Sequence, residues 1–147
     1  MPKNLALGVV AEVFSRLGHR MFPEGTTVLT GFAQLRLGKM YKVEVIAEED
    51  EAGVAIQLVR TERFPEQNRE KINGLILQIN EDRKYGTGGD RWLRIAPTTE
   101  QCGWFKVVVV AKIEADQPHT LSPEHCQSKL ADVFGAVSLF EITLALQ

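Results

Sequence analysis

Three glycines within the segment KYGTGGD, residues 84–90, are the residues whose type and spacing most suggest chemistry. A glycine-rich loop binds phosphate when it follows a strand and opens a helix, because the helix N-terminus presents free N–H groups. Here the order is inverted, since the segment follows a helical pattern and precedes a strand pattern. The glycines therefore lie at the carbonyl end of the helix dipole, which does not favour an anion. We interpret Gly86 as a helix cap, and Gly88 and Gly89 as a turn.

Residues of the types that bind zinc are also present, but their spacing does not favour a metal site. They are Cys102, His119, His125 and Cys126. His125 and Cys126 are adjacent on a predicted helix, so their side chains point about 100° apart and suit one ion poorly. No C-x-x-C pair is present. The sequence predicts no metal site and no cofactor.

Catalytic signatures of hydrolases are missing from the sequence. It has neither a G-x-S-x-G elbow nor an H-E-x-x-H pair. The acidic run at 48–51 falls in a predicted hairpin turn, where carboxylates are usually solvated. We therefore predict no catalytic residues and a protein that is not an enzyme. The first alternative is a small-ligand-binding or enzymatic domain whose pocket carries no motif.

Positive and aromatic side chains come close together after the central helix, at Arg83, Lys84, Arg91, Trp92 and Arg94. Such a group can neutralise and stack a single nucleic-acid strand. Acidic residues dilute it, however, and the chain carries a formal charge of −2. Single-stranded nucleic-acid binding is therefore the second alternative, behind protein binding.

The composition is that of an ordinary globular protein. The chain has 147 residues, of which 44% are hydrophobic and 24% charged, and this length suits one domain spanning residues 1–147. No apolar run of about 18 residues predicts a membrane span. The two cysteines fit a reducing compartment, and we predict a cytoplasmic protein with no membrane partner.

The elements that must position these residues follow from hydrophobic periodicity. Helical periods cover 3–18, 65–84 and 122–147, and strand periods cover 28–37, 41–48, 54–62, 91–97 and 103–115. The order α-β-β-β-α-β-β-α predicts an α+β fold with three helices and an antiparallel five-stranded sheet. Pro65 suits a first helical turn, and Ser122 suits an N-cap. The final segment, 139–146, alternates well enough to be either helix or strand.

Apolar stripes on the second and third helices predict the core and a subunit contact. Their residues are Ile72, Leu75, Ile76, Ile79, Leu139, Phe140 and Leu144. The last helix is apolar on more than one face, and such a helix must be covered on most sides. A second subunit can supply part of that cover, and so can the chain's own sheet.

Two segments carry a resemblance to a known family. In EKINGLILQINEDRKYGTGGDRWLRI, residues 70–95, an asparagine near the helix end (Asn80) precedes the aromatic-glycine step Tyr85-Gly86. The segment 121–124 reads Leu-Ser-Pro-Glu and opens the last helix. With the order of elements, these features resemble the type III secretion chaperone-like fold and are similar to the YbjN family.

The resemblance implies a non-enzymatic, usually dimeric protein that binds other polypeptides. In the related chaperones, a client lies in extended form along the sheet and hydrophobic patches. We therefore predict a chaperone-like or regulatory protein-binding module that acts as a homodimer. The candidate contacts with the partner polypeptide are Phe32, Ile46, Trp92 and Trp104.

Overall fold

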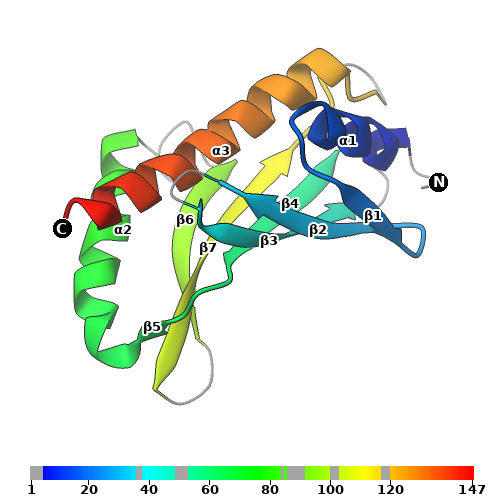
Figure 1. Ribbon diagram of the computed structural model, residues 1–147. Helices are drawn as coiled ribbons and strands as arrows, with labels where there is room; N and C mark the ends of the chain where they lie inside the picture. The colour runs from blue at the N-terminus through cyan, green and yellow to red at the C-terminus, as the bar shows by residue number, and fades with distance from the viewer. Residues whose placement is uncertain are drawn as a thin grey trace.

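The computed structural model describes residues 5–35, 38–48, 53–83, 85, 92–99, 103–116 and 120–147. Three α-helices and one antiparallel sheet make up this part of the chain (Figure 1). The helices are α1 (Leu5–Arg16), α2 (Arg69–Arg83) and α3 (Pro123–Ala145). The strands are β1 (Met21–Glu24), β2 (Val28–Gln34), β3 (Met40–Ala47), β4 (Val54–Arg60), β5 (Phe64–Pro65), β6 (Leu93–Thr99) and β7 (Trp104–Ile113). The predicted α+β class is confirmed.

The sheet has seven strands, so the prediction of five was wrong. The first five strands of the sheet lie in the order β1-β2-β3-β4-β7. One side of β7 pairs with β4 and, further along, with the short β5, and the other side pairs with β6. The added strands are β1 and β5, which are short and contain prolines that hide them from a periodicity search. Proline is tolerated at a sheet edge, where its missing N–H costs no ladder bond.

Gly31 lets β1 approach β2. A Cβ atom at this position would lie only 2.6 Å from the carbonyl oxygen of Arg20, just before β1. Any residue other than glycine would therefore push the start of β1 away from the sheet.

Helices α1 and α3 cover one face of the sheet, and α2 packs beside β6 and α3 (Figure 1). The strands alternate accordingly, since every second residue of β3, β4 and β7 is buried towards the helices. The largest fully buried side chains include Phe14 of α1, Tyr41 of β3, Phe105 of β7 and Phe140 of α3. The core therefore lies between the sheet and α1 and α3.

The last segment, 139–146, is helical through Ala145, which resolves the choice left open by its sequence. Val137, Phe140 and Glu141 are buried at helical spacing, so the sheet selects the helical period over the alternating one. Ser122 caps α3 as predicted, because its Oγ accepts a hydrogen bond from the backbone N–H of His125 at 3.2 Å. Pro65 instead belongs to β5, and a short 3-10 turn (Glu66–Asn68) precedes α2.

Asn80 joins the end of α2 to the outer edge of β6. Its Nδ2 donates to the carbonyl oxygen of Ile95 at 2.8 Å, and its Oδ1 accepts from the N–H of Ile95 at 3.1 Å. This pair of bonds reproduces what a neighbouring strand would supply. The side chain of Asn80, which carries part of the family resemblance, therefore caps the free edge of β6. An uncapped edge can pair with a strand of another molecule.

Candidate functional site

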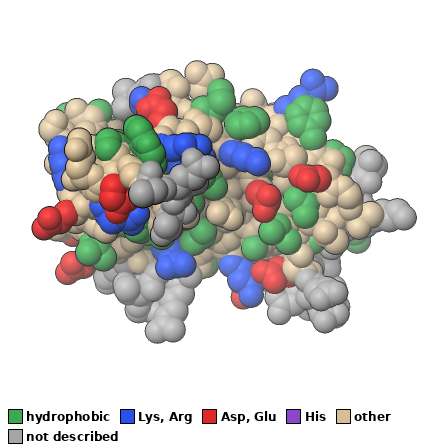
Figure 2. Space-filling view, turned by 90° about the horizontal axis from the view of Figure 1, so that it is seen from below, with side chains coloured by type: hydrophobic (Ala, Val, Ile, Leu, Met, Phe, Trp, Pro, Cys, Tyr) green, Lys and Arg blue, Asp and Glu red, His purple; other side chains and the backbone are tan. Residues whose placement is uncertain are grey.

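In the described part of the chain, no helix lies over the face of the sheet that points away from α1 and α3. Figure 2 views the molecule from below Figure 1 and shows hydrophobic side chains on this side, mixed with basic and acidic ones. We call this surface the open face. It is formed by the residues of each strand that alternate with the core residues.

Strand register arranges the open face in rows. One row crosses the sheet from β2 to β6 through Phe32, Lys42, Val59, Val108 and Ala96. We call it the apolar row, because all of its members except Lys42 are apolar. Residues directly opposite each other on antiparallel strands share a face and contact their neighbours. The row is therefore a strip of mostly hydrophobic side chains, in which Phe32 is the most exposed apolar member and Val108 is buried.

Three of the four predicted partner contacts belong to the open face. Phe32 and Ile46 are 55% and 42% exposed, and Trp104, at the first position of β7, is 45% exposed. Alternation places all three opposite the core-facing residues of their strands. They are spread over the face, with Phe32 near one edge and Trp104 at the far end of β7.

Trp92, the fourth predicted contact, lies apart from the other three. The Lys129 ammonium of α3 sits over its indole ring, 4.3 Å from the centroid. Trp92 also lines two hollows beside α3, of about 440 and 550 Å³. Residues of α3 line both hollows, so Trp92 lies on the helix side of the molecule.

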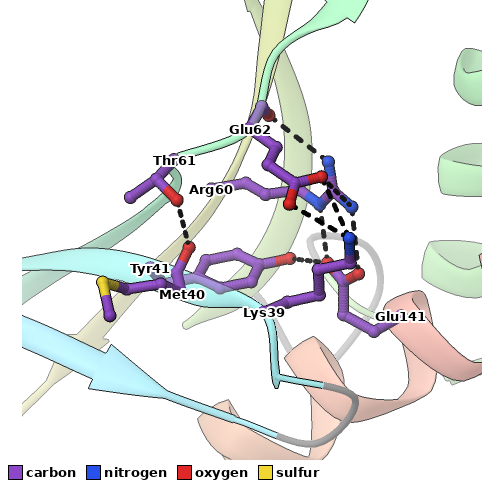
Figure 3. Close-up of polar contacts among 7 residues, drawn as sticks. All are labelled: Lys39, Met40, Tyr41, Arg60, Thr61, Glu62 and Glu141. Atoms are coloured by element: carbon purple, nitrogen blue, oxygen red, sulfur yellow. Dashed lines mark hydrogen bonds and ion pairs between the residues drawn. The ribbon is translucent and has the colours of Figure 1, made fainter.

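A buried ion pair holds the last turns of α3 to the sheet (Figure 3). The Arg60 guanidinium of β4 donates from Nε to Glu141 Oε2 at 2.8 Å, and from Nη2 to Oε1 at 3.2 Å. The Tyr41 hydroxyl of β3 donates to the same Oε2 at 2.5 Å. Both charged side chains are almost fully buried, with 4% and 2% of their area exposed. Three elements therefore meet at one carboxylate.

Further contacts complete this network. Arg60 also donates to the carbonyl oxygen of Glu62 at 3.3 Å, and its guanidinium lies over the Phe64 ring, 4.5 Å from the centroid. Burial and the neighbouring Glu141 carboxylate raise the pKa of Tyr41, so the hydroxyl keeps its proton. A buried charge is tolerated when it is paired and hydrogen-bonded, and here each partner is both.

Sequence reasoning missed this network. One signal was available: Glu141 is the single acidic residue in the apolar stretch VSLFEITLAL of the last helix. A carboxylate among core positions needs a cationic partner. The partner, Arg60, is 81 residues away, and only the folded chain brings the two together. The network positions α3 and has no access to a substrate, so we assign it no catalytic role.

The seven predicted core or interface residues divide into two groups. Ile72, Ile76, Ile79 and Phe140 are buried within the chain and belong to its core. Leu75, Leu139 and Leu144 are partly buried and pack against that core. Leu75 and Leu139 line an open hollow of about 390 Å³ between α2 and α3. The partly buried group is therefore the part available for contact with another chain.

The metal and nucleotide candidates are described only in part. Gly86, Gly88 and Gly89, with Cys102 and His119, lie outside the described residues. Cys126 is fully buried, and burial raises the pKa of its thiol to about 12. Among the described residues, no three His, Cys, Asp or Glu side chains lie close enough together to bind a metal ion.

The residues of the nucleic-acid alternative are divided between two sides of the molecule. Arg83 and Trp92 line a hollow beside α3, and Arg94 lies on the open face. Lys84 and Arg91 fall outside the described residues. The described members therefore form no continuous strip. Separately, no helix in the described part of the chain is long and apolar enough to cross a membrane.

Comparison with solved structures identifies the fold. The structure aligns with the crystal structure of YbjN from E. coli, a proposed transcription regulator, at a TM-score of 0.61. The alignment covers 91% of this chain and 87% of that chain. This chain has a YbjN-like fold. The sequences are only 12% identical, so the likeness concerns the YbjN-like fold and not a shared task. No protein-family model matches the sequence, and no curated protein matches it in a sequence search.

Proposed function

We propose that this chain is a non-enzymatic protein-binding module, chaperone-like or regulatory, whose open face contacts the partner polypeptide. The observation that carries this proposal is a sheet face without helical cover on which Phe32, Ile46 and Trp104 are each more than 40% exposed. Large exposed hydrophobic side chains on one surface are typical of interaction sites. The proposed regulatory role of the YbjN structure, which shares the fold, is compatible with this function.

Enzymatic function has less support. The hollows lined by described residues beside α3 are open, and the buried polar network around Glu141 is sealed from solvent. An active site needs reactive groups that a substrate can reach. A broad, partly apolar sheet face that none of the described helices covers suits recognition of a polypeptide better than it suits bond-making chemistry.

We also propose that the protein is a homodimer through α2 and α3. Leu139, Ile142 and Leu146 follow one another along one side of α3, and the last two are 37% and 81% exposed. Leu75 of α2 lies across the hollow from Leu139. This surface is separate from the open face, so a dimer formed here leaves both open faces free for partners.

Affinity capture with matched variants tests the binding proposal. The wild-type chain, a Phe32→Asp/Ile46→Asp variant and a Leu77→Asp control are immobilised and exposed to the native cell extract. Leu77 is 67% exposed on α2, so the control adds the same kind of charge away from the open face. We expect one protein, identified by mass spectrometry, to bind the wild type and the control and to be lost with the open-face variant. Equal capture by all three chains would contradict the proposal.

A further inference from the structure

The charges of the open face differ in sign from the charge of the whole chain. Its described strand residues include four basic side chains and two acidic ones: Lys42, Arg94, Lys106, Lys112, Glu24 and Glu44. Arg20 adds a further guanidinium, 5.6 Å from the centre of the Phe22 ring at the β1 edge, and Glu48, directly after β3, adds a carboxylate that lies 3.8 Å from the Lys112 ammonium. The chain as a whole carries −2. The described part of the open face therefore carries five basic and three acidic side chains on an acidic protein, and this excess of positive charge favours anionic partners.

The basic side chains surround the apolar row. Lys42 lies within the row, between Phe32 and Val59. Arg94 and Lys106 are each two residues from a member of the row, on β6 and β7. Adjacent strands are about 4.8 Å apart, so the row is about 19 Å long across its four strand spacings. That length accommodates a short segment of another chain.

We infer that the open face binds an acidic amphipathic polypeptide segment, with apolar side chains on the apolar row and carboxylates on Lys42 and Arg94. This inference rests on the proposed function and adds the chemical class of the partner. Apolar contacts supply most of the affinity, and the complementary charges supply specificity and fast association.

Two other occupants fit the open face less well. A second copy of this chain docking face to face would oppose two basic surfaces, which repel each other. A single nucleic-acid strand needs exposed aromatic rings on which bases stack. The open face has exposed aromatic rings, but Phe22 and Phe32 lie near the β1 edge and Trp104 lies at the far end of β7. The centre of the face carries Val59 and the buried Val108 instead. Leucine-like side chains suit that surface better than bases do.

Fluorescence anisotropy with defined peptides tests the inference on the full-length chain. The probes are a peptide in which leucine and glutamate alternate, its leucine–lysine counterpart, a serine–glutamate peptide and an oligothymidylate. We expect the leucine–glutamate peptide to bind at least about tenfold more tightly than each of the others, with an affinity that falls as salt increases. Equal binding of the two leucine peptides, or no peptide binding, would overturn the inference. If the serine–glutamate peptide binds as tightly as the leucine–glutamate peptide, the face recognises negative charge alone. If the oligothymidylate binds more tightly than either peptide, the face recognises nucleic acid. Either result also overturns the inference.

Charge reversal locates the site. Lys42→Glu/Arg94→Glu should weaken leucine–glutamate binding about tenfold and improve leucine–lysine binding, because two attractions become repulsions. The control, Lys71→Glu/Arg83→Glu, makes the same charge change at exposed positions of α2. It should leave both peptide affinities within about twofold of wild type, because salt screens charges that lie far from the bound peptide. Circular dichroism confirms that both variants are folded. Unchanged binding by the folded open-face variant would overturn the inference.

The two proposals can fail separately. If Phe32→Asp/Ile46→Asp abolishes capture of a partner while charge reversal has no effect, protein binding stands and the acidic class is wrong. If capture is unaffected by the open-face variant, the proposed function itself falls.

Discussion

A single carboxylate, Glu141, connects three elements of this protein at the residue scale. It accepts hydrogen bonds from Tyr41 of β3 and Arg60 of β4 while lying on α3. The apolar surroundings strengthen these bonds, and they also make an unpaired charge costly. The network therefore fixes how α3 lies on the sheet more than it adds net stability.

Removing the charge of Glu141 tests this account. Glu141→Gln keeps the shape of the side chain but leaves Arg60 as a buried, uncompensated cation, so we expect the free energy of unfolding to fall by about 3 kcal/mol. Urea denaturation followed by circular dichroism measures the change. The control is Glu62→Gln, which removes a mostly exposed partner of Arg60 and Lys39 and should cost less than about 1 kcal/mol. A combined Tyr41→Phe/Arg60→Met/Glu141→Leu variant leaves no member of the network unpaired and should stay within about 1 kcal/mol of wild type. Equal losses for the two single variants would contradict the account.

We expect His19 to make the stability of the fold depend on pH under mildly acidic conditions. Its ring lies 5.2 Å from that of Phe134 of α3 and 6.4 Å from that of Phe14 of α1, and partial burial lowers its pKa from 6.5. The unfolded chain therefore takes up the proton first as pH falls through this value, which favours unfolding. The contribution of His19 is fully present above about pH 6.5 and is lost as the pH drops through the lower folded value.

We expect the midpoint of urea unfolding to fall between about pH 7.5 and about pH 5.5, and His19→Asn to reduce that fall. Titration of the His19 ring by NMR should give a pKa below 6.5. His125→Asn is the control, because His125 lies at the start of α3, far along the helix from Phe134. An identical pH dependence in wild type and His19→Asn would exclude this role.

Protection of the sheet edge is the main feature at the scale of elements. β6 is paired with β7 on one side, and its other side receives both hydrogen bonds of the Asn80 side chain at Ile95. At the opposite end, β1 is only four residues long and contains Pro23. Short edge strands, prolines and side-chain caps all hinder edge-to-edge pairing between molecules.

Replacing Asn80 should expose this edge. Asn80→Ala leaves a part-buried N–H and C=O of Ile95 without their partner, so we expect a loss of about 2 kcal/mol and faster aggregation on heating. Asn80→Asp keeps the oxygen that accepts from Ile95 N–H and loses the donor, so its loss should be smaller. Differential scanning calorimetry and light scattering measure the two effects. If Asn80→Ala is as stable and soluble as wild type, the side chain does not protect the edge.

Two separate surfaces define the protein at the scale of the whole molecule. The open face is basic and partly apolar, and the outer side of α2 and α3 carries Leu75, Leu139, Ile142 and Leu146. Their separation would let the proposed dimer and the proposed partner binding coexist. Phe140, which sequence alone placed in the core or interface, is fully buried, so a charge there would unfold the chain without testing the dimer.

Exposed positions test the dimer more cleanly. Ile142→Asp/Leu146→Asp places two charges on the proposed subunit contact, so we expect a dimeric wild type and a folded, monomeric variant. The dissociation constant should rise about hundredfold or more. Sedimentation velocity measures the association state, and Leu77→Asp, on a side of α2 that does not line the hollow, should remain dimeric. A monomeric wild type would rule out the proposed dimer.

Periodicity by itself determined the main elements. The stripes Ile72/Ile76/Ile79 and Leu130/Val133/Val137 predict α2 and α3, and the alternation of β3, β4 and β7 predicts an antiparallel sheet with one covered face. These elements are long enough for their apolar period to be read locally. The N-cap Ser122 and the order of the elements, which are both part of the family resemblance, could also be predicted from short stretches of the sequence.

Only the tertiary structure decided the rest. β1 and β5 are too short to show a period and exist because longer strands supply their partners. The pairing of Arg60 with Glu141 and of Asn80 with Ile95 joins residues distant in the chain. The basic sign of the open face arises because register brings Lys42, Arg94 and Lys106 to one side of the sheet. Such features depend on which residues fold next to each other, and local patterns do not contain that information.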